Sequence, residues 1–175
     1  QDYSVGRTPW DKGGPSPALL EVINSGELPT SSEVLVPGCG YGHDVAALAQ
    51  AGCTVTGLDI SELALAEARS SNGADGASYV LGDFFDPSLV ELNRYDVIWA
   101  HTCFCAITPD LRGGYVDAAH RLLKPSGVLI GVFFAFAQDP EGDGPPYKTN
   151  IETIERHFKK RFTLEWARLP QDHFP

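Results

Sequence analysis

The sequence is short of basic residues. Its 175 residues include 13 lysines and arginines but 23 aspartates and glutamates, which gives a formal net charge of −10. Proteins that bind nucleic acids usually present a basic face to the phosphates, so the composition argues against DNA or RNA as the main partner. The one basic run, RHFKKR from Arg156 to Arg161, is typical of the solvent-facing side of a helix.

Long apolar runs are absent as well. A membrane-spanning helix needs roughly 20 apolar residues, whereas the longest apolar stretch, Val128 to Ala137, contains Gly131 and predicts a buried strand. We therefore expect no membrane partner, and no signal peptide is recognisable. Because the first residue is Gln1 rather than methionine, we expect an N-terminal piece to be missing before it.

Cysteines are few, and their spacing forms no disulfide framework. A reducing, cytoplasmic location is therefore expected. Cys103 and Cys105 have the spacing of a metal-binding pair, but a structural zinc site needs four ligands. The sequence offers no second pair and no nearby His-x-x-His, so we expect no metal. The four cysteines are Cys39, Cys53, Cys103 and Cys105.

What the sequence does contain is an alternation of apolar strands and helical segments. This order predicts an α/β fold, a Rossmann-like, doubly wound and mainly parallel sheet in a three-layer sandwich. The length favours one domain, residues 1–175. A seventh strand, usual for this class of sheet, is expected beyond the C-terminal residue. Strands are expected at 33–36, 53–58, 78–81, 95–100, 128–136 and 162–168, and helices at 18–24, 44–51, 62–70, 110–123 and 151–161.

The stretch from Glu33 to Ala47, EVLVPGCGYGHDVAA, organises the rest of the chain. An apolar strand leads through Gly38, Gly40 and Gly42 into a helical pattern. Glycines allow a sharp turn and let a ligand approach the backbone without meeting a Cβ atom. A strand, a glycine-rich turn and a helix N-terminus together predict a binding site for a nucleotide-like cofactor.

Two features choose between such cofactors. The dinucleotide fingerprint G-x-G-x-x-G has its last glycine where this chain has His43, which favours S-adenosylmethionine over NAD or FAD. Acidic residues also end the next two strands. Asp59 suits the ribose hydroxyls, and Asp83 suits the adenine amine, with Phe84 alongside the ring. Each aspartate equally suits a turn or a helix cap.

Further segments resemble a known family. TPWDKG begins at Thr8, LVPGCGYGHDV at Leu35, GLDIS at Gly57, GDFF at Gly82, FCAI at Phe104, LLKPSG at Leu122 and GPPYK at Gly144. Over nearly its whole length the chain resembles the class I S-adenosylmethionine-dependent methyltransferases. TPWD, FCAI and GPPYK are similar, more specifically, to the thiopurine-methyltransferase superfamily and its branch of halide and thiol methyltransferases.

The resemblance implies S-adenosylmethionine as the cofactor and a set of residues that contact it. Plant members often carry an acid and an aromatic residue where this chain has Ala100 and His101, so a side chain and a backbone carbonyl both stay open as partners of the methionine amino group. Trp10 either docks on the protein's own core or covers the ligand. The implied contacts are Trp10, Gly38, Gly40, Gly42, Asp59, Ile60, Asp83, Phe84, His101 and Thr102.

The acceptor side is expected to be aromatic. Transfer of a methyl group to a soft anion needs alignment and a dry site rather than a strong base. His101 is a candidate to accept a thiol proton, although a capping or hydrogen-bonding role is more common for such a residue. Cys105 and Tyr147 are the other catalytic candidates. The candidate walls are Trp10, Phe104, Phe133, Phe134, Phe136 and Tyr147, although strand phenylalanines also suit a plain sheet core.

These inferences combine into one expectation: a cytoplasmic S-adenosylmethionine-dependent methyltransferase, of EC 2.1.1 class, acting on a small thiol, hydrosulfide or halide. A larger sulfur or selenium acceptor, such as a thiopurine-like heterocycle, is the alternative. An NAD(P)-binding oxidoreductase and a non-catalytic cofactor-binding protein are more distant rivals. Residues 1–17 would form an arm over the ligand, 18–137 the cofactor-binding core and 138–175 the acceptor side, with the oligomeric state left open.

Overall fold

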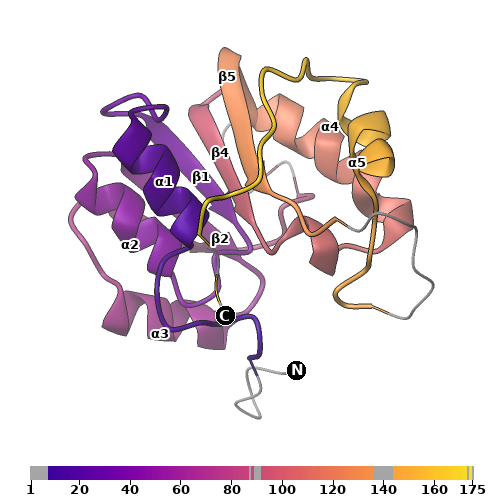
Figure 1. The fold of residues 1–175 in the computed structure, drawn as a ribbon. Coiled ribbons are helices and arrows are strands. Elements are labelled where there is room, and N and C mark those ends of the chain that lie inside the picture. Colours follow the sequence, from indigo (N-terminus) through magenta and orange to yellow (C-terminus); the bar gives the residue numbers. More distant parts are fainter. Residues whose placement is uncertain (1–7, 87, 89–91, 136–143, 173, 175) are drawn as a thin grey trace.

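A computed structural model describes residues 8–86, 88, 92–135, 144–172 and 174. The described residues form five strands and five α-helices, which alternate along most of the chain (Figure 1). The strands are β1 (Glu33–Pro37), β2 (Thr54–Asp59), β3 (Ala77–Leu81), β4 (Tyr95–His101) and β5 (Leu123–Val132). The helices are α1 (Pro17–Ser25), α2 (His43–Gln50), α3 (Glu62–Ser71), α4 (Arg112–Leu122) and α5 (Ile151–Phe158), with 3₁₀ turns η2 (Phe104–Ala106) and η3 (Pro109–Leu111).

The five strands form one parallel sheet in the order β3-β2-β1-β4-β5. Helices α1, α2 and α3 lie on one side of it, and α4 and α5 lie on the other (Figure 1). The predicted α/β, doubly wound architecture is therefore confirmed. The strand order reverses between β1 and β4, and in open sheets of this kind ligands bind outside the carboxyl ends of the strands at that point.

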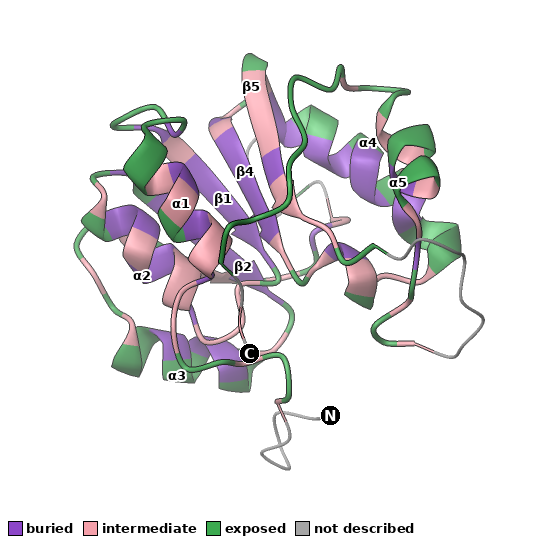
Figure 2. Ribbon diagram, viewed as in Figure 1, coloured by how far each residue is buried: buried purple, intermediate pink, exposed green. Residues whose placement is uncertain are grey.

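The central strands are buried on both faces, as parallel sheets require (Figure 2). Alternate side chains of β1 and β4 face opposite layers. Val36 and Trp99 pack with α1 and α2, whereas Leu35 and Ile98 pack with α4 and α5. Trp99 is 1% exposed, so its indole nitrogen needs a hydrogen-bond acceptor inside the protein. This acceptor is Asp44 in the first turn of α2.

The predicted helix ends are confirmed at three places. Gly26 ends α1 with a φ of 74°, in the left-handed region that glycine reaches without strain. The Ser61 hydroxyl accepts a hydrogen bond from Ala64 N at 3.3 Å at the start of α3. The Asn150 side chain accepts one from Thr153 N at 2.8 Å at the start of α5. No helix among the residues described is long and apolar enough to cross a bilayer.

The start of β5 differs from the prediction. Pro125 to Gly127 was expected to separate helix and strand, but β5 begins at Leu123, directly after α4. Leu123 pairs with Tyr95 and Val128 pairs with Val97, so the residues between them bulge out of the ladder. Lys124 Nζ holds the bulge by donating to Asp96 Oδ1 at 2.9 Å. At its other end β5 stops at Val132, and Phe136 lies outside the described residues.

The predicted sixth strand, 162–168, is wrong for the structure described here. These residues alternate as a strand would, but a strand needs a neighbour to pair with, and this segment joins no described ladder. It instead passes in front of β5 and reaches α1 (Figure 1). Two hydrogen bonds of 2.6 Å join the Arg168 guanidinium to Glu27, and Asp172 N donates to Glu21 at 2.8 Å.

The sheet predicts one local test of stability. A Cβ atom at Gly57 in β2 would lie 2.9 Å from Cys39 Sγ and 3.0 Å from Val45 Cγ2. We expect Gly57→Ala to lower the free energy of unfolding by about 1–3 kcal/mol through overpacking, as measured by urea denaturation. The control is Gly113→Ala in α4, where no atom lies within 4 Å, and this change should be neutral or stabilise by up to about 1 kcal/mol. Equal effects of the two changes would contradict the packing described.

Candidate functional site

The glycine loop leaves the carboxyl end of β1 in left-handed backbone conformations. Gly38, Gly40 and Gly42 have φ values of 64°, 53° and 81°. Gly42 is also the N-cap of α2, and a Cβ atom there would lie 2.5 Å from Tyr79 Oη. A side chain at position 42 is therefore excluded twice, by its backbone angle and by its neighbour.

Asp59 fixes this loop to the end of β2. Its Oδ2 accepts a hydrogen bond from Gly40 N, and its Oδ1 accepts one from Ser61 N, both at 2.9 Å. The side chain therefore does serve as a turn and cap residue, one of its two predicted roles. Asp59 is 8% exposed, and contact with a ribose stays a prediction.

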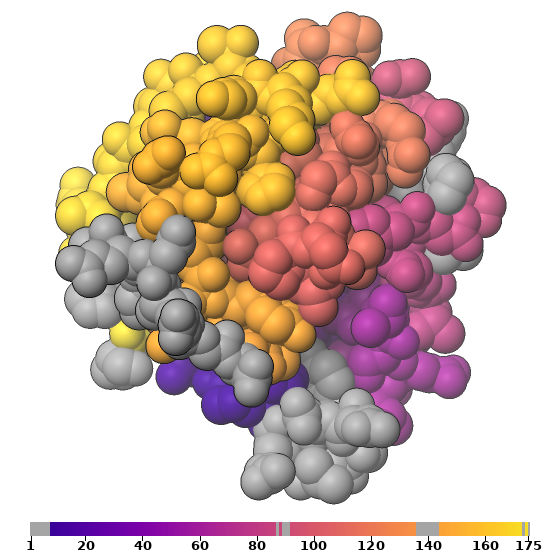
Figure 3. Space-filling view, turned by 90° about the vertical axis from the view of Figure 1, so that its right-hand side faces the viewer, coloured from indigo at the N-terminus to yellow at the C-terminus, as the bar shows by residue number. Residues whose placement is uncertain are grey.

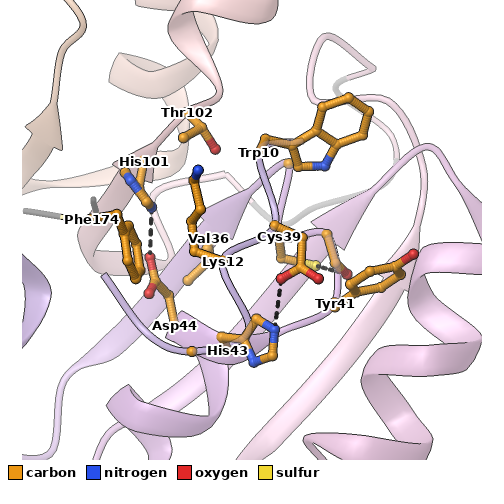
Figure 4. A pocket seen from close by; sticks show the side chains of 14 residues that line it. Trp10, Lys12, Val36, Cys39, Tyr41, His43, Asp44, His101, Thr102 and Phe174 are labelled. Carbon is orange, nitrogen blue, oxygen red and sulfur yellow. Dashed lines mark hydrogen bonds and ion pairs between the residues drawn. The ribbon is translucent and has the colours of Figure 1, made fainter. Parts of the chain in front are cut away.

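A pocket opens between this loop, the carboxyl end of β4 and the N-terminal arm (Figure 4). The arm contributes Trp10 to Lys12, the loop Gly38 to Tyr41, α2 its first two residues, and β4 contributes His101 with Thr102 after it. The structure thus brings together Trp10, two of the three loop glycines and His101 as predicted. Trp10 is 39% exposed, and the ring of Phe174 also lies in the pocket.

His43, where a dinucleotide-binding loop would have a glycine, holds the arm in place. Its Nε2 lies 3.0 Å from Asp11 Oδ1 (Figure 4), and its Nδ1 lies 3.3 Å from the Asn72 amide nitrogen. Asn72 also donates to the Tyr41 carbonyl at 2.8 Å. Because the amide nitrogen can only donate, His43 accepts at Nδ1 and donates from Nε2 to the aspartate.

Asp44, the next residue, joins three parts of the chain. Its Oδ1 accepts a hydrogen bond from Ser16 N in the arm, and its Oδ2 accepts one from the buried Trp99 indole, both at 2.7 Å. The same Oδ2 lies 3.4 Å from His101 Nδ1. A single carboxylate therefore connects the arm, the first turn of α2 and the end of β4.

Five predicted cofactor contacts do not line this pocket, namely Gly42, Asp59, Ile60, Asp83 and Phe84. Ile60 is 76% exposed at the end of β2. Asp83 forms a turn by accepting from Phe85 N at 2.9 Å. Phe84 belongs to the core, where its ring centroid lies 4.8 Å from that of Tyr115. For Ile60, Asp83 and Phe84, contact with the adenosine half of a cofactor stays a prediction.

A second cluster, the Arg112 cluster, gathers Phe104, Cys105, Arg112 and Tyr147. Tyr147 N donates to the Cys105 carbonyl at 2.6 Å, and Arg112 Nη2 donates to the Tyr147 carbonyl at 2.9 Å. The guanidinium carbon lies 5.0 Å from the Phe104 ring centroid. Figure 3 shows the segments around residues 105–115 and 144–158 packed against each other on this face. The structure thus brings together three of the candidates for the acceptor side, namely Phe104, Cys105 and Tyr147. Phe104 itself is only 4% exposed.

A sharp bend in the chain after β4 links the pocket to the Arg112 cluster. Thr102 follows β4 with a φ of 56°, which is unusual for a residue with a Cβ atom. The bend carries the chain from His101 in the pocket to Phe104 in the Arg112 cluster within three residues. Of the other expected walls, Phe133 packs on Phe104 with a centroid distance of 5.5 Å, and Phe134 is 54% exposed.

Cys105 does not have the environment of an activated nucleophile. Burial raises the pKa of its thiol, even though the nearby Arg112 acts in the opposite direction. The Cys105 thiol donates to the Thr102 carbonyl at 3.3 Å. Burial also raises the pKa of Cys103 to about 12. Among the described residues, no three His, Cys, Asp or Glu side chains gather closely enough to hold a metal ion.

Comparison with known proteins fixes the family. The family model of thiopurine S-methyltransferase matches residues 1–174. The chain belongs to the thiopurine S-methyltransferase family. This finding confirms the resemblance deduced from TPWD, FCAI and GPPYK, which recur in the pocket and in the Arg112 cluster.

Two of the curated proteins that are similar to this chain are plant methyltransferases. Thiocyanate methyltransferase 1 of Arabidopsis thaliana is 41% identical over 152 residues, which cover 85% of this chain and 65% of that protein. Probable thiol methyltransferase 2 of the same plant is 36% identical over 160 residues, 89% of this chain and 69% of that protein. This family member therefore spans about two thirds of the length of these relatives.

A solved structure agrees with this placement. A protein studied for the conversion of a disulfide bond into a thioacetal group during echinomycin biosynthesis superposes with a TM-score of 0.76 and 25% identity. The match covers 90% of this thiopurine S-methyltransferase family member and 75% of that chain.

Sequence reasoning missed several residues of this family member's site. Asp44 and Lys12 lie within segments that it quoted, but contacts such as Asp44 with Trp99 join residues far apart in the chain. Arg112 gave no signal, because an arginine in a helical pattern is usually exposed, whereas this one is 2% exposed. An acidic residue in the first turn of the helix that follows a glycine loop is the one signal that would have pointed to Asp44.

The raised pKa of Cys105 predicts low thiol reactivity. A smaller thiolate fraction at neutral pH slows alkylation, because the thiolate is the reactive form. We expect iodoacetamide to modify Cys105 at pH 7.5 at least about tenfold more slowly than a free cysteine, with the rate rising at higher pH than for the free amino acid. Mass spectrometry locates the modification, and Cys105→Ser is the control. Alkylation as fast as that of free cysteine would contradict the assignment.

Proposed function

We propose that this chain binds S-adenosylmethionine and transfers its methyl group to a small soft nucleophile, namely a thiol, hydrosulfide, thiocyanate or halide. The observation that carries the proposal is the pocket at the β1–β4 switch point, where a glycine loop lies beneath an aromatic arm residue. Family membership supports the reaction class. The names of the relatives at 41% and 36% identity, thiocyanate and thiol methyltransferases, support the acceptor class.

The residues of the pocket fit the amino-acid half of this cofactor. That half is a zwitterion next to a sulfonium cation, and the pocket offers charges of both signs. Lys12 is suited to its carboxylate, Asp44 is suited to its ammonium group, and Trp10 offers an aromatic face to the sulfonium. Ala100 has no acid to offer, so a carboxylate from α2 is a natural replacement. When bound, S-adenosylmethionine supplies an electrophilic methyl group.

The adenosine half would extend toward the ends of β2 and β3. Asp59, Ile60 and Asp83 lie at those strand ends, and the exposed Ile60 side chain is free of the core and suited to cover an apolar ring face. The bare backbone of Gly38 and Gly40 leaves room for close approach, since neither residue has a Cβ atom. In this arrangement the arm, residues 1–17, acts as a cover.

The Arg112 cluster supports an anionic acceptor. Arg112 is buried and in contact with an aromatic ring, and its charge also acts to lower the pKa of His157, after burial itself. A buried cation among apolar walls favours a weakly hydrated anion such as thiocyanate or a thiolate over a neutral group. The main contributions of the protein are then alignment, which supplies up to roughly 10 kcal/mol, and exclusion of water.

Other parts of the proposal are less closely tied to the site. All four cysteines are free, which fits a reducing, cytoplasmic location. Residues 138–175 would complete the acceptor side, where the loop before Tyr147 lies partly outside the described residues.

The alternative acceptor, a thiopurine-like heterocycle, is favoured by the name of the family model. An oxidoreductase is disfavoured, because His43 is engaged with the arm.

An acceptor screen tests the proposal. With S-adenosylmethionine present, we expect release of S-adenosylhomocysteine to depend on added thiocyanate, sulfide, a small thiol or iodide, as followed by a coupled assay. Faster turnover of a thiopurine than of every small acceptor would favour the alternative. Absence of release with any of these acceptors would contradict the proposal.

Arg112 provides a more specific prediction. We expect Arg112→Gln to lower kcat/KM for thiocyanate at least about tenfold, or roughly 1.4 kcal/mol, because the buried charge is lost. Arg112→Lys keeps the charge but not the planar fork, so its loss should be smaller. Affinity for S-adenosylhomocysteine, measured by calorimetry, should stay within about twofold in both variants. Equal kcat/KM values in Arg112→Gln and the wild type would contradict the role.

A further inference from the structure

Two residues of the pocket form a pair that methyl transfer to a halide or thiocyanate does not need. Asp44 lies in the first turn of α2, and His101 is the last residue of β4. Asp44 Oδ2 and His101 Nδ1 are 3.4 Å apart (Figure 4), and the side chains are 12% and 21% exposed. The pair lies at the switch point of the sheet, where the reacting groups of the proposed function would meet.

The orientation of Asp44 is fixed by its other contacts. Ser16 N and Trp99 Nε1 both donate to it at 2.7 Å, one to each oxygen. Ser16 is 3% exposed and Trp99 is 1% exposed, so water cannot reach these donors to replace Asp44 as their hydrogen-bond acceptor. The carboxylate therefore cannot rotate away from His101 without breaking two buried hydrogen bonds.

The contact also favours one ring nitrogen as the site of the proton. A carboxylate can only accept, so its position 3.4 Å away favours a hydrogen on His101 Nδ1 and a lone pair on Nε2. Two other charged groups face the same pocket. Lys12 lines its wall, and Asp11 is engaged with His43 Nε2 and Gly13 N. Phe174 stacks on the imidazole with a centroid distance of 6.3 Å.

We propose that Asp44 is a positioning residue that holds His101 as the proton acceptor for thiols, so that the site methylates neutral thiols as well as preformed anions. This inference rests on the proposed function. The thiol proton passes to His101 Nε2, and the sulfur electron pair forms the new bond to the methyl carbon. The electron pair of the broken bond stays on the former sulfonium sulfur, which becomes a neutral thioether. The imidazolium then returns its proton to water.

The inference separates acceptors by whether they carry a proton. Thiocyanate and iodide have none to lose, so the pair contributes nothing to their reaction. A neutral alkyl thiol must lose its proton before or during attack. A residue that acts only on structure or on cofactor binding would affect both kinds of acceptor equally.

The test compares a small alkyl thiol with thiocyanate in Asp44→Asn, using release of S-adenosylhomocysteine as the readout. At pH 7 we expect kcat with the thiol to fall at least about tenfold further than kcat with thiocyanate, because only the thiol needs a proton acceptor. The deficit with the thiol should shrink as the pH approaches the pKa of that thiol, because the acceptor then arrives ionised.

Matched variants separate positioning from folding. Trp99→Phe removes one of the two buried hydrogen bonds that orient Asp44, so the ratio of thiol to thiocyanate turnover should fall in the same direction as in Asp44→Asn, but by less. His101→Gln should lower the same ratio, and the double variant Asp44→Asn/His101→Gln should be no worse than His101→Gln alone. Circular dichroism and urea denaturation verify that each variant is folded.

Each remaining outcome decides the matter. Equal losses with both acceptors in Asp44→Asn, or a ratio unchanged in His101→Gln, would overturn the inference, and the second result counts even if Asp44→Asn fails to fold. Wild-type turnover of thiocyanate without any turnover of thiols would overturn the inference alone. Wild-type turnover of neither acceptor would overturn the proposed function, and the inference with it.

Discussion

The close fit of the glycine loop against the sheet is the constraint on which the rest of the structure depends. Asp59 binds Gly40 N, Gly57 leaves room for the Cys39 thiol, and Gly42 passes beside Tyr79 where no side chain would fit. These contacts set the direction in which α2 begins. Because α2 begins there, its first two residues, His43 and Asp44, reach the N-terminal arm through Asp11 and Ser16. Loop and arm thus behave as one unit around the pocket.

The site consists of two chemically distinct halves joined by a short bend. The pocket of loop, arm and His101 holds charges of both signs, whereas the Arg112 cluster places one buried cation among aromatic rings. The left-handed Thr102 makes the connection between them. Such a division suits a reaction that brings a zwitterionic, cationic donor to a soft anion, because each partner meets the opposite charge in a region of low polarity.

Much of the fold could be predicted from the sequence, because apolar runs and glycines act locally. The strands around Val36 and Trp99 and the caps at Ser61 and Asn150 are of this kind. The failures have a common cause, since the segment 162–168 and the bulge before Val128 depend on which neighbour a strand meets. The contacts at the site likewise depend on which residues the fold brings together.

The glycine loop and His101 could be picked out as candidates from the sequence. Asp44 and Arg112 could not, because their contacts with Trp99 and Tyr147 join residues 55 and 35 positions apart in the chain. The sequence could not show that Phe84 packs in the core, because an aromatic residue after a strand suits a core and a ligand equally well. The central claim is tested most directly by isothermal titration calorimetry of the folded protein with S-adenosylhomocysteine and, separately, with NADH. The account predicts one saturable site for S-adenosylhomocysteine, weakened by Gly42→Ala, and no heat of binding with NADH. Binding of NADH, or no binding of S-adenosylhomocysteine, would contradict it.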